Sequence, residues 1–498
     1  MEGRPQAFEF PRVAWHELLR ASAARVPDKP ALIFRNRPWT YRDLLDQGER
    51  VASGLSRLGI RPGDRVLLGL RNRPEYVLGL YAASRLGAIA VPMNASYKAE
   101  EARYHLDHSG ARLALLEPET WERIRPIRGE LGALEQVVVV GEPSGDLPWE
   151  ALLAEPGAEV PSPDRHPAEE VFVILYSSGT TGQPKGVMLT HQNVVASHHQ
   201  YLAAGKVGAD DISLVFVPAC HVYGLNLVGG ALTAGATQLL LERYRLETCL
   251  DLVRRHRVTL FYATTAVLIE LGQFPRLHEY DLSSVRYINS GGAPLPPELG
   301  AKVEKRLGIR VANGYGMTEA PISGFRVPGE ERRVVDPESG RELAPFEPGE
   351  ILIRGPHVMK GYWRDPEETR RVLRDGWLWT GDVGYLDEAG RVRVVSRRKE
   401  LIKYKGFAVS PLELEGLLLD HPAVADCAVV GKPDPLAGEV PKAFVVLLPG
   451  ARVTAEELMA FVGGRVAEYK RIRAVAFVEE IPRNASGKIM KRLLAEEG

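Results

Sequence analysis

In the first part of the chain, segments whose apolar residues have helical spacing alternate with segments that have the pattern of strands. Segments with helical spacing are interleaved with short apolar runs of the kind found in buried strands. Thr40 is suited to the N-cap of one helix, and Gly59 lies just beyond its end. This alternation predicts parallel strands with crossover helices. The expected helices are 13–27, 40–59 and 75–90, and the expected strands are 31–34, 64–70, 171–178, 214–219 and 284–292.

The pattern changes near residue 394. A β-rich segment over 349–386 is followed by a dense basic stretch, and the last residues, about a hundred, have a helix and strand pattern of their own, enough for a small α+β domain. We expect an α/β protein with an N-terminal domain over 1–396, a hinge at 397–400 and a C-terminal domain over 401–498. The first combines parallel-type sheets and crossover helices with a β-rich subdomain, and the last is a small, mobile α+β domain.

Composition limits the choice of partners. The 498 residues are too many for one hydrophobic core. The 63 basic and 64 acidic side chains nearly cancel, so no basic excess favours a nucleic acid or an anionic membrane as partner. Cys220, Cys249 and Cys427 lie far apart, which predicts reduced thiols rather than a disulfide framework or a CxxC metal site.

One segment, 212–241, contains no acidic or basic side chain. It nevertheless includes Pro218, His221, Asn226, Gln238 and four glycines, which indicates a buried strand, a loop and a small-residue helix rather than a membrane span. The N-terminus has acidic residues and prolines where a signal peptide needs an apolar stretch. We expect a cytoplasmic protein, with peripheral membrane association if the substrate is a long-chain acid.

The segment YSSGTTGQPKG over 176–186 carries the sharpest chemical signal. It follows an apolar strand and precedes a helix expected near Thr190. Its glycines, hydroxyls and lysine make a loop rich in hydrogen-bond donors, as a polyphosphate requires. The P-loop pattern cannot be laid on it. A plain flexible turn is the alternative, which the ordered Pro-Lys-Gly after a strand disfavours.

This segment resembles the phosphate loop of the adenylate-forming superfamily of acyl-CoA synthetases, adenylation domains and beetle luciferases. Further motifs follow in the family's order, and the resemblance covers nearly the whole chain. It is strongest to fatty-acid and 4-coumarate-type CoA ligases, and it implies ATP, Mg²⁺, coenzyme A and a small carboxylic acid as ligands. These motifs are NGYGMTE (313–319, adenine and α-phosphate), WTGD (379–382, ribose), SRRKELIKYKGF (396–407, hinge and pantetheine) and PRNASGK (482–488, catalytic lysine).

The family's chemistry explains the residue types. A carboxylate attacks the α-phosphate of ATP to give acyl-AMP and pyrophosphate, and coenzyme A then takes the acyl group. Two anions meet in the first step, which calls for positive charge and donors at that phosphorus. The resemblance implies that Lys488 bridges carboxylate and phosphate and that Thr318 donates to the α-phosphate. Glu319, with Thr181, would hold Mg²⁺, which prefers oxygen ligands.

The resemblance also assigns the remaining nucleotide contacts. The phosphate loop would contact the departing pyrophosphate, Asp382 would accept from the ribose hydroxyls, and Arg397 would bind from the other side. Lys399 is the expected pivot, with Lys403 directed to AMP and Lys405 to coenzyme A. The full set of expected contacts is Ser177, Ser178, Gly179, Thr180, Thr181, Lys185, Asn313, Gly314, Tyr315, Gly316, Met317, Asp382, Arg397, Lys399, Lys403, Lys405, Gly406 and Phe407.

The acyl side is drawn from two further segments, PACHVYGLN and SGGAP. They resemble the family segments that border the carboxylate and the wall opposite, where small residues leave room for the acyl group. The expected residues are His221, which also ranks as catalytic, Tyr223, Gly224, Asn226, Gly291, Gly292 and Ala293.

Each residue has a plainer interpretation when taken singly. Glu319 could begin a helix, Asp382 could belong to a turn, Lys488 could be solvated, and His221 could be a hydrogen-bonded core histidine. The order of the motifs favours the functional interpretation. His191, His198 and His199 lie in a helix-like stretch without metal-ligand partners, and we expect them to be solvated.

The expected function is an acyl-CoA synthetase acting on a fatty acid of medium or long chain, as a monomer or homodimer. An aryl or 4-coumarate-type CoA ligase is the main alternative. An amino-acid adenylation enzyme is a further alternative, although 218–226 lacks the acid that would bind the substrate's ammonium. A luciferase-like oxygenase is poorly excluded by sequence. A non-catalytic nucleotide-binding module would predict the loss of Lys488, Glu319 or the phosphate loop, and all are present. The family's dicarboxylate-specific members tend to carry a basic residue where this chain has Asn313, which disfavours malonate.

Overall fold

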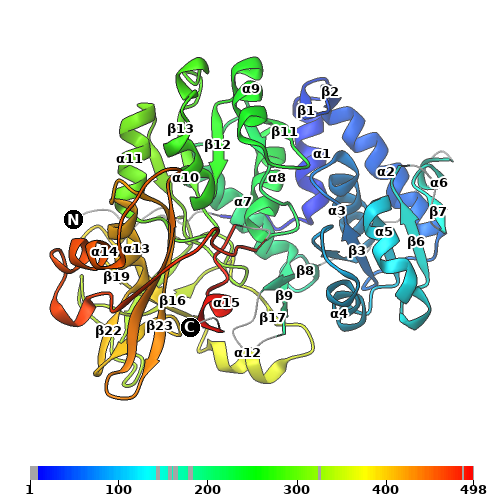
Figure 1. The fold of residues 1–498 in the computed structure, drawn as a ribbon. Coiled ribbons are helices and arrows are strands. Elements are labelled where there is room, and N and C mark those ends of the chain that lie inside the picture. Colours follow the sequence, from blue (N-terminus) through cyan, green and yellow to red (C-terminus); the bar gives the residue numbers. More distant parts are fainter. Residues whose placement is uncertain are drawn as a thin grey trace, which may run out of the picture. The chain divides into compact units, whose positions relative to one another are not determined.

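The computed structural model describes residues 9–141, 146–154, 160, 166–177, 183–323, 327–484 and 487–496. The chain divides into two compact units. Figure 1 labels the helices and strands in chain order. Unit 1 takes in residues 1–260, 316–331 and 354–376, and unit 2 takes in 261–315, 332–353 and 377–498. The hinge at 397–400 falls within unit 2 and stays a prediction.

The larger sheet of unit 1 has the strand order β17-β9-β8-β4-β3-β5-β6-β7. Strands β8, β4, β3, β5, β6 and β7 pair in parallel, whereas β9 pairs antiparallel with β8 and with β17. The bounds are β3 Arg65–Gly69, β4 Ile89–Pro92, β5 Leu113–Leu116, β6 Gln136–Val139, β7 Leu147–Pro148, β8 Val171–Ser177, β9 Lys185–Thr190 and β17 Gly361–Tyr362.

A second group of strands in unit 1 has the order β10-β11-β1-β2. Here β10, β11 and β1 are parallel, and β2 closes a hairpin with β1. The carboxyl end of β10 leads into the predicted acyl segment. The bounds are β1 Pro30–Phe34, β2 Arg37–Thr40, β10 Ile212–Val215 and β11 Thr237–Leu240.

Local sequence signals mark where several helices of unit 1 begin. Thr40 forms a capping box with Asp43, and Thr190 forms one with Asn193. Helix α3 begins with Pro74, where proline suits the first turn. The bounds are α1 Trp15–Arg25, α2 Tyr41–Arg57, α3 Pro74–Leu86, α4 Ala99–Ser109, α5 Pro118–Ile124, η1 Arg125–Glu130, α6 Glu150–Leu153, α7 His191–Gly205, α8 Val222–Ala234, α9 Leu246–His256 and α12 Pro366–Val372, with the short strand β18 Leu373–Arg374.

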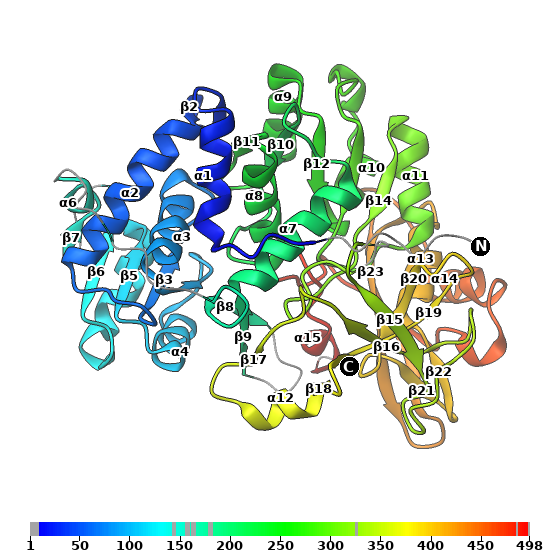
Figure 2. The same ribbon diagram turned by 180° about the vertical axis from the view of Figure 1, so that it is seen from behind.

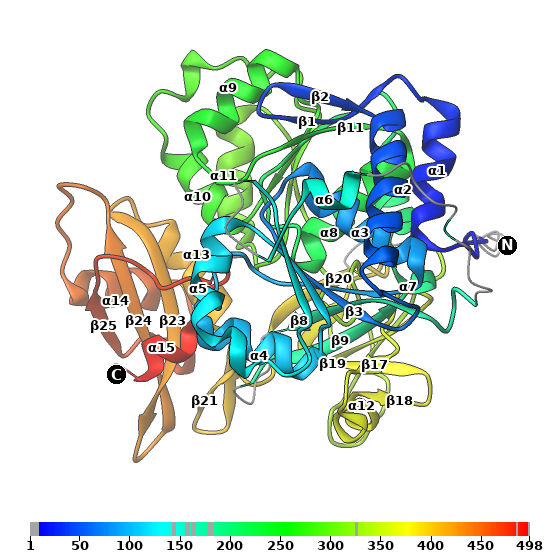
Figure 3. The same cartoon turned by 90° about the vertical axis from the view of Figure 1, so that its right-hand side faces the viewer.

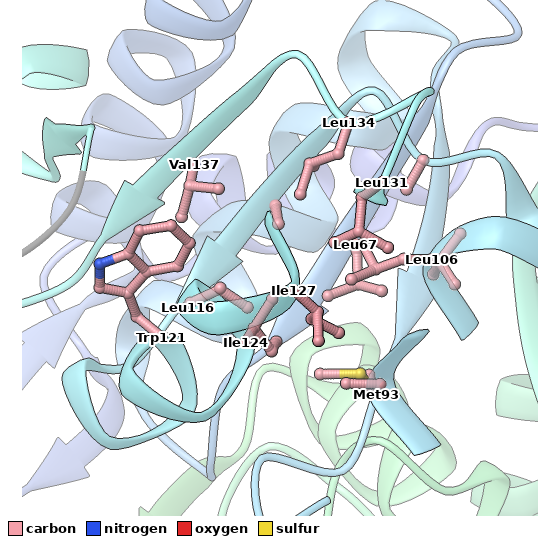
Figure 4. Close-up of a cluster of buried hydrophobic side chains, with 14 of the residues drawn as sticks. Leu67, Met93, Leu106, Leu116, Trp121, Ile124, Ile127, Leu131, Leu134 and Val137 are labelled. Atoms are coloured by element: carbon pink, nitrogen blue, oxygen red, sulfur yellow. The ribbon is translucent and has the colours of Figure 1, made fainter. Parts of the chain in front are cut away.

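A hydrophobic cluster joins α4, α5 and η1 to the larger sheet (Figure 4). Figure 3 shows the ribbon of α4 and α5. Trp121 and Ile124 of α5 pack against Leu116 and Val137 of the parallel strands. Every one of these side chains is almost fully buried. Burial of this size favours folding by about 25 cal/mol per Å² of apolar surface. The cluster therefore fixes the sheet whose strand β8 ends at the phosphate loop.

Unit 2 begins with three strands and the helices between them. Their order is β14-β13-β12, with β13 and β14 parallel. The bounds are β12 Leu260–Ala263, α10 Thr265–Gln273, η2 Leu277–Glu279, β13 Tyr287–Ser290, α11 Pro297–Leu307 and β14 Val311–Asn313.

Two further sheets complete unit 2 (Figure 2). In one, the order is β15-β16-β19, and β20 pairs antiparallel with β19. In the other, the order is β22-β21-β24-β23, and β25 pairs in parallel with β24. The bounds are β15 Glu331–Val335, β16 Gly349–Arg354, β19 Trp377–Leu386, β20 Val392–Arg397, β21 Ile402–Tyr404, β22 Phe407–Val409, α13 Pro411–Leu419, β23 Val424–Asp434, β24 Gly438–Leu447, α14 Ala455–Gly463, η3 Glu468–Lys470, β25 Ala474–Phe477 and α15 Lys491–Glu496.

The α/β fold class is confirmed. Parallel-type sheets with crossover helices, a β-rich part and a smaller α+β part follow one another as expected. The uncharged segment 212–241 contains β10, a loop, α8 and β11, as its composition predicts. Within the described part of the chain, no helix has the length and apolarity to cross a bilayer. All three cysteines are free thiols.

Candidate active site

The end of β8 and the turn after Gly316 place two motif residues together in unit 1. Ser177 Oγ donates to Glu319 Oε1 over 3.1 Å. Tyr362 of β17 donates to the same oxygen over 3.0 Å. Burial and the nearby carboxylate raise the pKa of Tyr362, so its hydroxyl remains a donor at neutral pH. The sequence analysis did not find Tyr362, because nothing local marks its contact with Glu319.

A tight turn holds Thr318 and Glu319. The backbones of Met317 and Ala320 exchange hydrogen bonds of 3.0 and 3.1 Å, so Thr318 and Glu319 lie between them. A Cβ on Gly316 would lie 2.5 Å from the Pro321 carbonyl oxygen, which explains a glycine there. The turn thus holds Thr318 next to the buried Glu319. A hydroxyl donor and a carboxylate are the groups that the resemblance leads us to expect near an α-phosphate with Mg²⁺.

Lys185 begins β9 and already has an anionic partner. Its ammonium pairs with Glu368 of α12, and its Nζ lies 5.2 Å from the centre of the Tyr362 ring. Hydrogen bonds from Arg371 and Lys185 lower the pKa of Glu368 to about 2. A pyrophosphate group would therefore compete with this carboxylate for Lys185. Glu368 is a further residue that the sequence analysis missed.

Four of the expected phosphate-loop residues lie outside the described residues, namely Ser178, Gly179, Thr180 and Thr181. Thr181 is one of the two expected Mg²⁺ contacts. Among the described residues, no group of three or more His, Cys, Asp or Glu side chains is placed to hold a metal. Glu319, the other expected Mg²⁺ contact, is 6% exposed.

His221 is the N-cap of α8, and one nitrogen of its ring makes no hydrogen bond to another described residue. Among the described residues, Nε2 of His221 has no hydrogen-bond partner. Burial lowers the pKa of His221 to about 4, so the ring is neutral at pH 7. A buried polar atom without a partner is unusual in a folded protein. The neutral ring is suited to donate a hydrogen bond to a carboxylate.

Asn226, another expected acyl-side residue, directs its side-chain oxygen at buried groups of α7. Its Oδ1 accepts from Ser197 Oγ over 2.6 Å and from His198 Nδ1 over 2.9 Å. Trp15 Nε1 donates to His198 Nε2 over 2.9 Å, so the His198 proton is on Nδ1. The expectation that His191 and His198 are solvated is wrong: they are 1% and 0% exposed because each has a buried partner in α1.

In unit 2, three of the expected nucleotide contacts, Tyr315, Asp382 and Arg397, meet one another. Tyr315 donates from its hydroxyl to Asp382 Oδ2 over 2.7 Å, and Arg397 Nε lies 3.0 Å from Asp382 Oδ1. Asp382 and Arg397 are direct register partners on β19 and β20. Burial and the Asp382 carboxylate raise the pKa of Tyr315. The three expected contacts therefore lie together, with Asp382 3% exposed.

The small-residue wall follows β13. Gly291 donates its N–H to the Ala263 carbonyl over 3.0 Å, and Gly292 has a positive φ of 78° that favours glycine. Asn313 is exposed at the end of β14. A Cβ on Gly314 would lie 3.0 Å from Asn289 Oδ1, so the backbone passes close to β13 there.

Lys488 lies in a closed loop beside the end of β12. Its N–H donates to Asn484 Oδ1 over 3.0 Å, and Asn484 N–H donates back to the Lys488 carbonyl over 2.9 Å. A Cβ on Gly487 would lie 3.0 Å from Thr264 Oγ1. Because Ala263 also accepts from Gly291, the Lys488 loop and the small-residue wall flank the same strand end.

The expected coenzyme A contacts form the tip of the β21–β22 hairpin. Lys405 and Gly406 both have positive φ, the conformation of a tight two-residue hairpin turn. Phe407 is 57% exposed and stacks on Tyr469 with ring centres 4.8 Å apart. Lys403 is exposed on β21, and its backbone N–H donates to Glu439. Lys399 lies in the turn that links β20 to this hairpin.

We expect Asp382→Ala to weaken ATP and AMP binding with little change in acid preference. A hydrogen bond to a charged group contributes about 1.5–3 kcal/mol, which sets the expected loss. Calorimetric titration with each nucleotide measures it. The matched control is Asp387→Ala, which removes a carboxylate paired with Arg391 just beyond the end of β19. A shift in acid preference without a loss of nucleotide affinity would contradict the ribose assignment.

Comparison with known proteins gives the family. The model of the AMP-binding enzymes matches residues 19–363, and that of their C-terminal domain matches residues 413–488. The chain belongs to the AMP-binding enzyme family. A 4-coumarate–CoA ligase 3 of Oryza sativa subsp. japonica is 38% identical over 501 residues, which cover 95% of this chain and 90% of that protein.

Two solved structures share the fold along their length. The anthranilate CoA ligase AuaEII in complex with anthranoyl-AMP has a TM-score of 0.91 and 28% identity, covering 98% of both chains. ATP-bound MatB from Rhodopseudomonas palustris has a TM-score of 0.89 and 30% identity, covering 97% of this chain and 99% of that one. The adenylate-forming resemblance is confirmed. The chain is an AMP-forming acid–thiol ligase whose ligands are ATP, Mg²⁺, coenzyme A and a small-molecule acid.

Proposed function

We propose that this ligase activates an aromatic acid of the 4-coumarate class. The observation that carries the proposal is the similarity, along nearly the whole chain, to a 4-coumarate–CoA ligase. The shared fold with a ligase that holds anthranoyl-AMP, another aromatic acyl group, supports it. The relatives thus favour the aryl alternative over the fatty acid that we expected first.

The acyl segments are consistent with a flat, apolar substrate. Neither Pro218 to Asn226 nor Gly291 to Ala293 contains a charged side chain. His221 is neutral at pH 7 and can donate to the carboxylate without adding charge. Pockets for such ligands are lined mainly by apolar groups. Gly291 and Gly292 have no side chain and would leave space for a ring.

In the proposed first half-reaction, a carboxylate oxygen attacks the α-phosphorus and the bond to the β-phosphate oxygen breaks. Lys488 and Thr318 would stabilise the charge that gathers at that phosphorus. Glu319 would bind Mg²⁺, which neutralises the phosphates when bound. Lys185 and Ser177 would contact the pyrophosphate that leaves. Asp382, Tyr315 and Arg397 would hold the nucleoside.

In the proposed second half-reaction, the thiol sulfur of coenzyme A attacks the acyl carbon. The bond from that carbon to the phosphate oxygen breaks, and AMP and the thiol proton are released. Lys405, Gly406 and Phe407 would guide the pantetheine arm, and a glycine permits its close approach to the backbone.

The rate of AMP formation across a panel of acids tests the proposal. The panel includes 4-coumarate, cinnamate, benzoate, butyrate, octanoate and palmitate, each with ATP, Mg²⁺ and coenzyme A. We expect the highest kcat/KM for an aromatic acid. A preference for octanoate or palmitate would overturn the aryl assignment and restore the fatty-acid alternative.

We also expect acyl selectivity to change at the small-residue wall. Ala293→Leu and Gly291→Leu should slow the reaction of bulky acids more than that of acetate, because overpacking costs typically about 1–3 kcal/mol. Gly292 is not used, since its positive φ would add backbone strain. The measurement is kcat/KM for each acid, with the KM for ATP as control. Equal losses for small and bulky acids would place the acyl site elsewhere.

A further inference from the structure

The segment that carries His221 is held by two side chains at the start of α3. Asn72 lies just before that helix and Tyr76 lies in its first turn. Asn72 is 4% exposed and Tyr76 is 1% exposed. Neither belongs to a motif that the sequence analysis singled out, and both direct their polar atoms at the loop between β10 and α8.

Asn72 binds backbone groups at the end of β10, within that loop and just after β11. Its Nδ2 donates toward the carbonyls of Val217 and Val215, at 3.0 and 3.2 Å. A third carbonyl, that of Leu241, lies 3.3 Å away. Its Oδ1 accepts from the Ala219 N–H over 2.8 Å. The Val217 and Leu241 carbonyls lie beyond the ends of β10 and β11, where strand pairing has stopped, whereas the Val215 carbonyl also accepts from the Leu241 N–H over 3.0 Å.

Tyr76 completes the arrangement. Its hydroxyl donates to the Ala219 carbonyl over 2.7 Å, so both backbone polar groups of Ala219 are bound by side chains of the α3 region. Ala219 is two residues before His221. Burial raises the pKa of Tyr76, which keeps the hydroxyl protonated as a donor.

The path from Ala219 to His221 is short and leaves little freedom. The His221 N–H donates to the Pro218 carbonyl over 3.1 Å, and the His221 carbonyl accepts from Leu225 over 2.9 Å. A Cβ on Gly224 would lie 2.3 Å from the Pro218 carbonyl oxygen, so α8 packs directly on the loop. A displacement of Ala219 therefore moves the backbone that carries His221.

We propose that Asn72 and Tyr76 are positioning residues for the carboxylate site: they fix Ala219 and thereby the place of the His221 imidazole. They act through His221 and do not touch the acid. This inference rests on the role proposed above for His221. A purely structural role would differ, because it would lower stability without a selective effect on the acid.

The test is a double-mutant cycle of Tyr76→Phe and His221→Ala in the full chain. The acid is 4-coumarate, or whichever acid of the panel reacts fastest. Tyr76→Phe should raise the KM for the acid about tenfold, the effect of losing up to about 1.4 kcal/mol from one hydrogen bond. The KM for ATP should stay within about twofold. In the His221→Ala background, Tyr76→Phe should change the KM for the acid no further.

Tyr81→Phe is the matched control. Tyr81 lies on the same helix, is fully buried and donates its hydroxyl to Glu49, away from the His221 loop. We expect it to lower the unfolding temperature without raising the KM for the acid. Asn72→Ala provides a second variant and should follow the pattern of Tyr76→Phe.

The outcomes separate the two proposals. If His221→Ala leaves the KM and kcat for the acid unchanged, the role of His221 fails. If His221→Ala impairs the use of the acid but Tyr76→Phe and Asn72→Ala only lower the unfolding temperature, as Tyr81→Phe does, the positioning role fails. Additive effects in the cycle would also overturn it, because residues that act through one another do not contribute independently.

Discussion

Lys488→Ala should slow acyl-AMP formation by about 10²–10³-fold and leave thioester formation from pre-made acyl-AMP nearly unchanged. The proposed task of Lys488 is electrostatic and belongs to the first half-reaction alone. Its loop is held by the Asn484 hydrogen bonds and by the pair of Arg483 with Asp426, so loss of the side chain should not unfold it. Single-turnover release of pyrophosphate and of AMP measures the two steps separately.

Lys432→Ala serves as the control for this prediction. Lys432 is an exposed lysine on β23, in the same unit, and its loss should change neither half-reaction. If Lys488→Ala slows both half-reactions equally, its role is structural or belongs to a shared step. Equal slowing would contradict the catalytic assignment of Lys488, which so far depends on the order of the motifs.

The elements that the sequence predicted best are those governed by short-range rules. Helix α2 begins where Thr40 provides a cap and ends before Gly59, whose φ is 87°. The segment 212–241 forms strand, loop, helix and strand, since Pro218 falls in the loop after β10 and Gly235, with a φ of 79°, ends α8. Caps, breaks and periodicity act within a few residues, so a single sequence displays them.

The partners of the motif residues could not be predicted in this way. Lys185 pairs with Glu368, which is 183 positions away, and Glu319 accepts from Tyr362, which is 43 positions away. Such pairs depend on which strands and helices become neighbours in the fold. No local pattern records that, so the motifs gave the reacting groups but not the side chains that fix them.

The buried histidines also show that a local pattern does not reveal distant partners. His198 lies on α7 in a polar stretch, and its sequence neighbours favour a solvated side chain. It is buried because Trp15 and Asn226, both distant in the sequence, satisfy its two ring nitrogens. Asn72 and Tyr76 belong to this class as well, since their roles follow from the meeting of α3 with the end of β10.

Lys399→Pro should leave adenylation largely intact and slow thioester formation severely. Lys488 and the hairpin tip at Lys405 to Phe407 belong to the same predicted C-terminal domain, and both are proposed to act at one reacting carbon. In the structure the Lys488 loop flanks the end of β12, while Phe407 is stacked on Tyr469 and largely exposed. We expect a rigid-body rotation between the half-reactions to resolve this conflict, with a few residues absorbing the change in φ and ψ.

The turn at 397–400 is where we expect that pivot. It is closed by the Glu400 N–H bonding to the Arg397 carbonyl over 2.9 Å, and Lys399 is its third residue. Proline fixes φ at Lys399 and restricts the backbone of Arg398 before it.

Lys399→Ala is the control, because it removes the same side chain and leaves the backbone free to rotate. Both half-reactions are measured by single turnover, together with thermal unfolding. Thioester formation at the parental rate in Lys399→Pro would place the hinge elsewhere. Equal slowing of both steps would mean that proline had broken the turn rather than locked it.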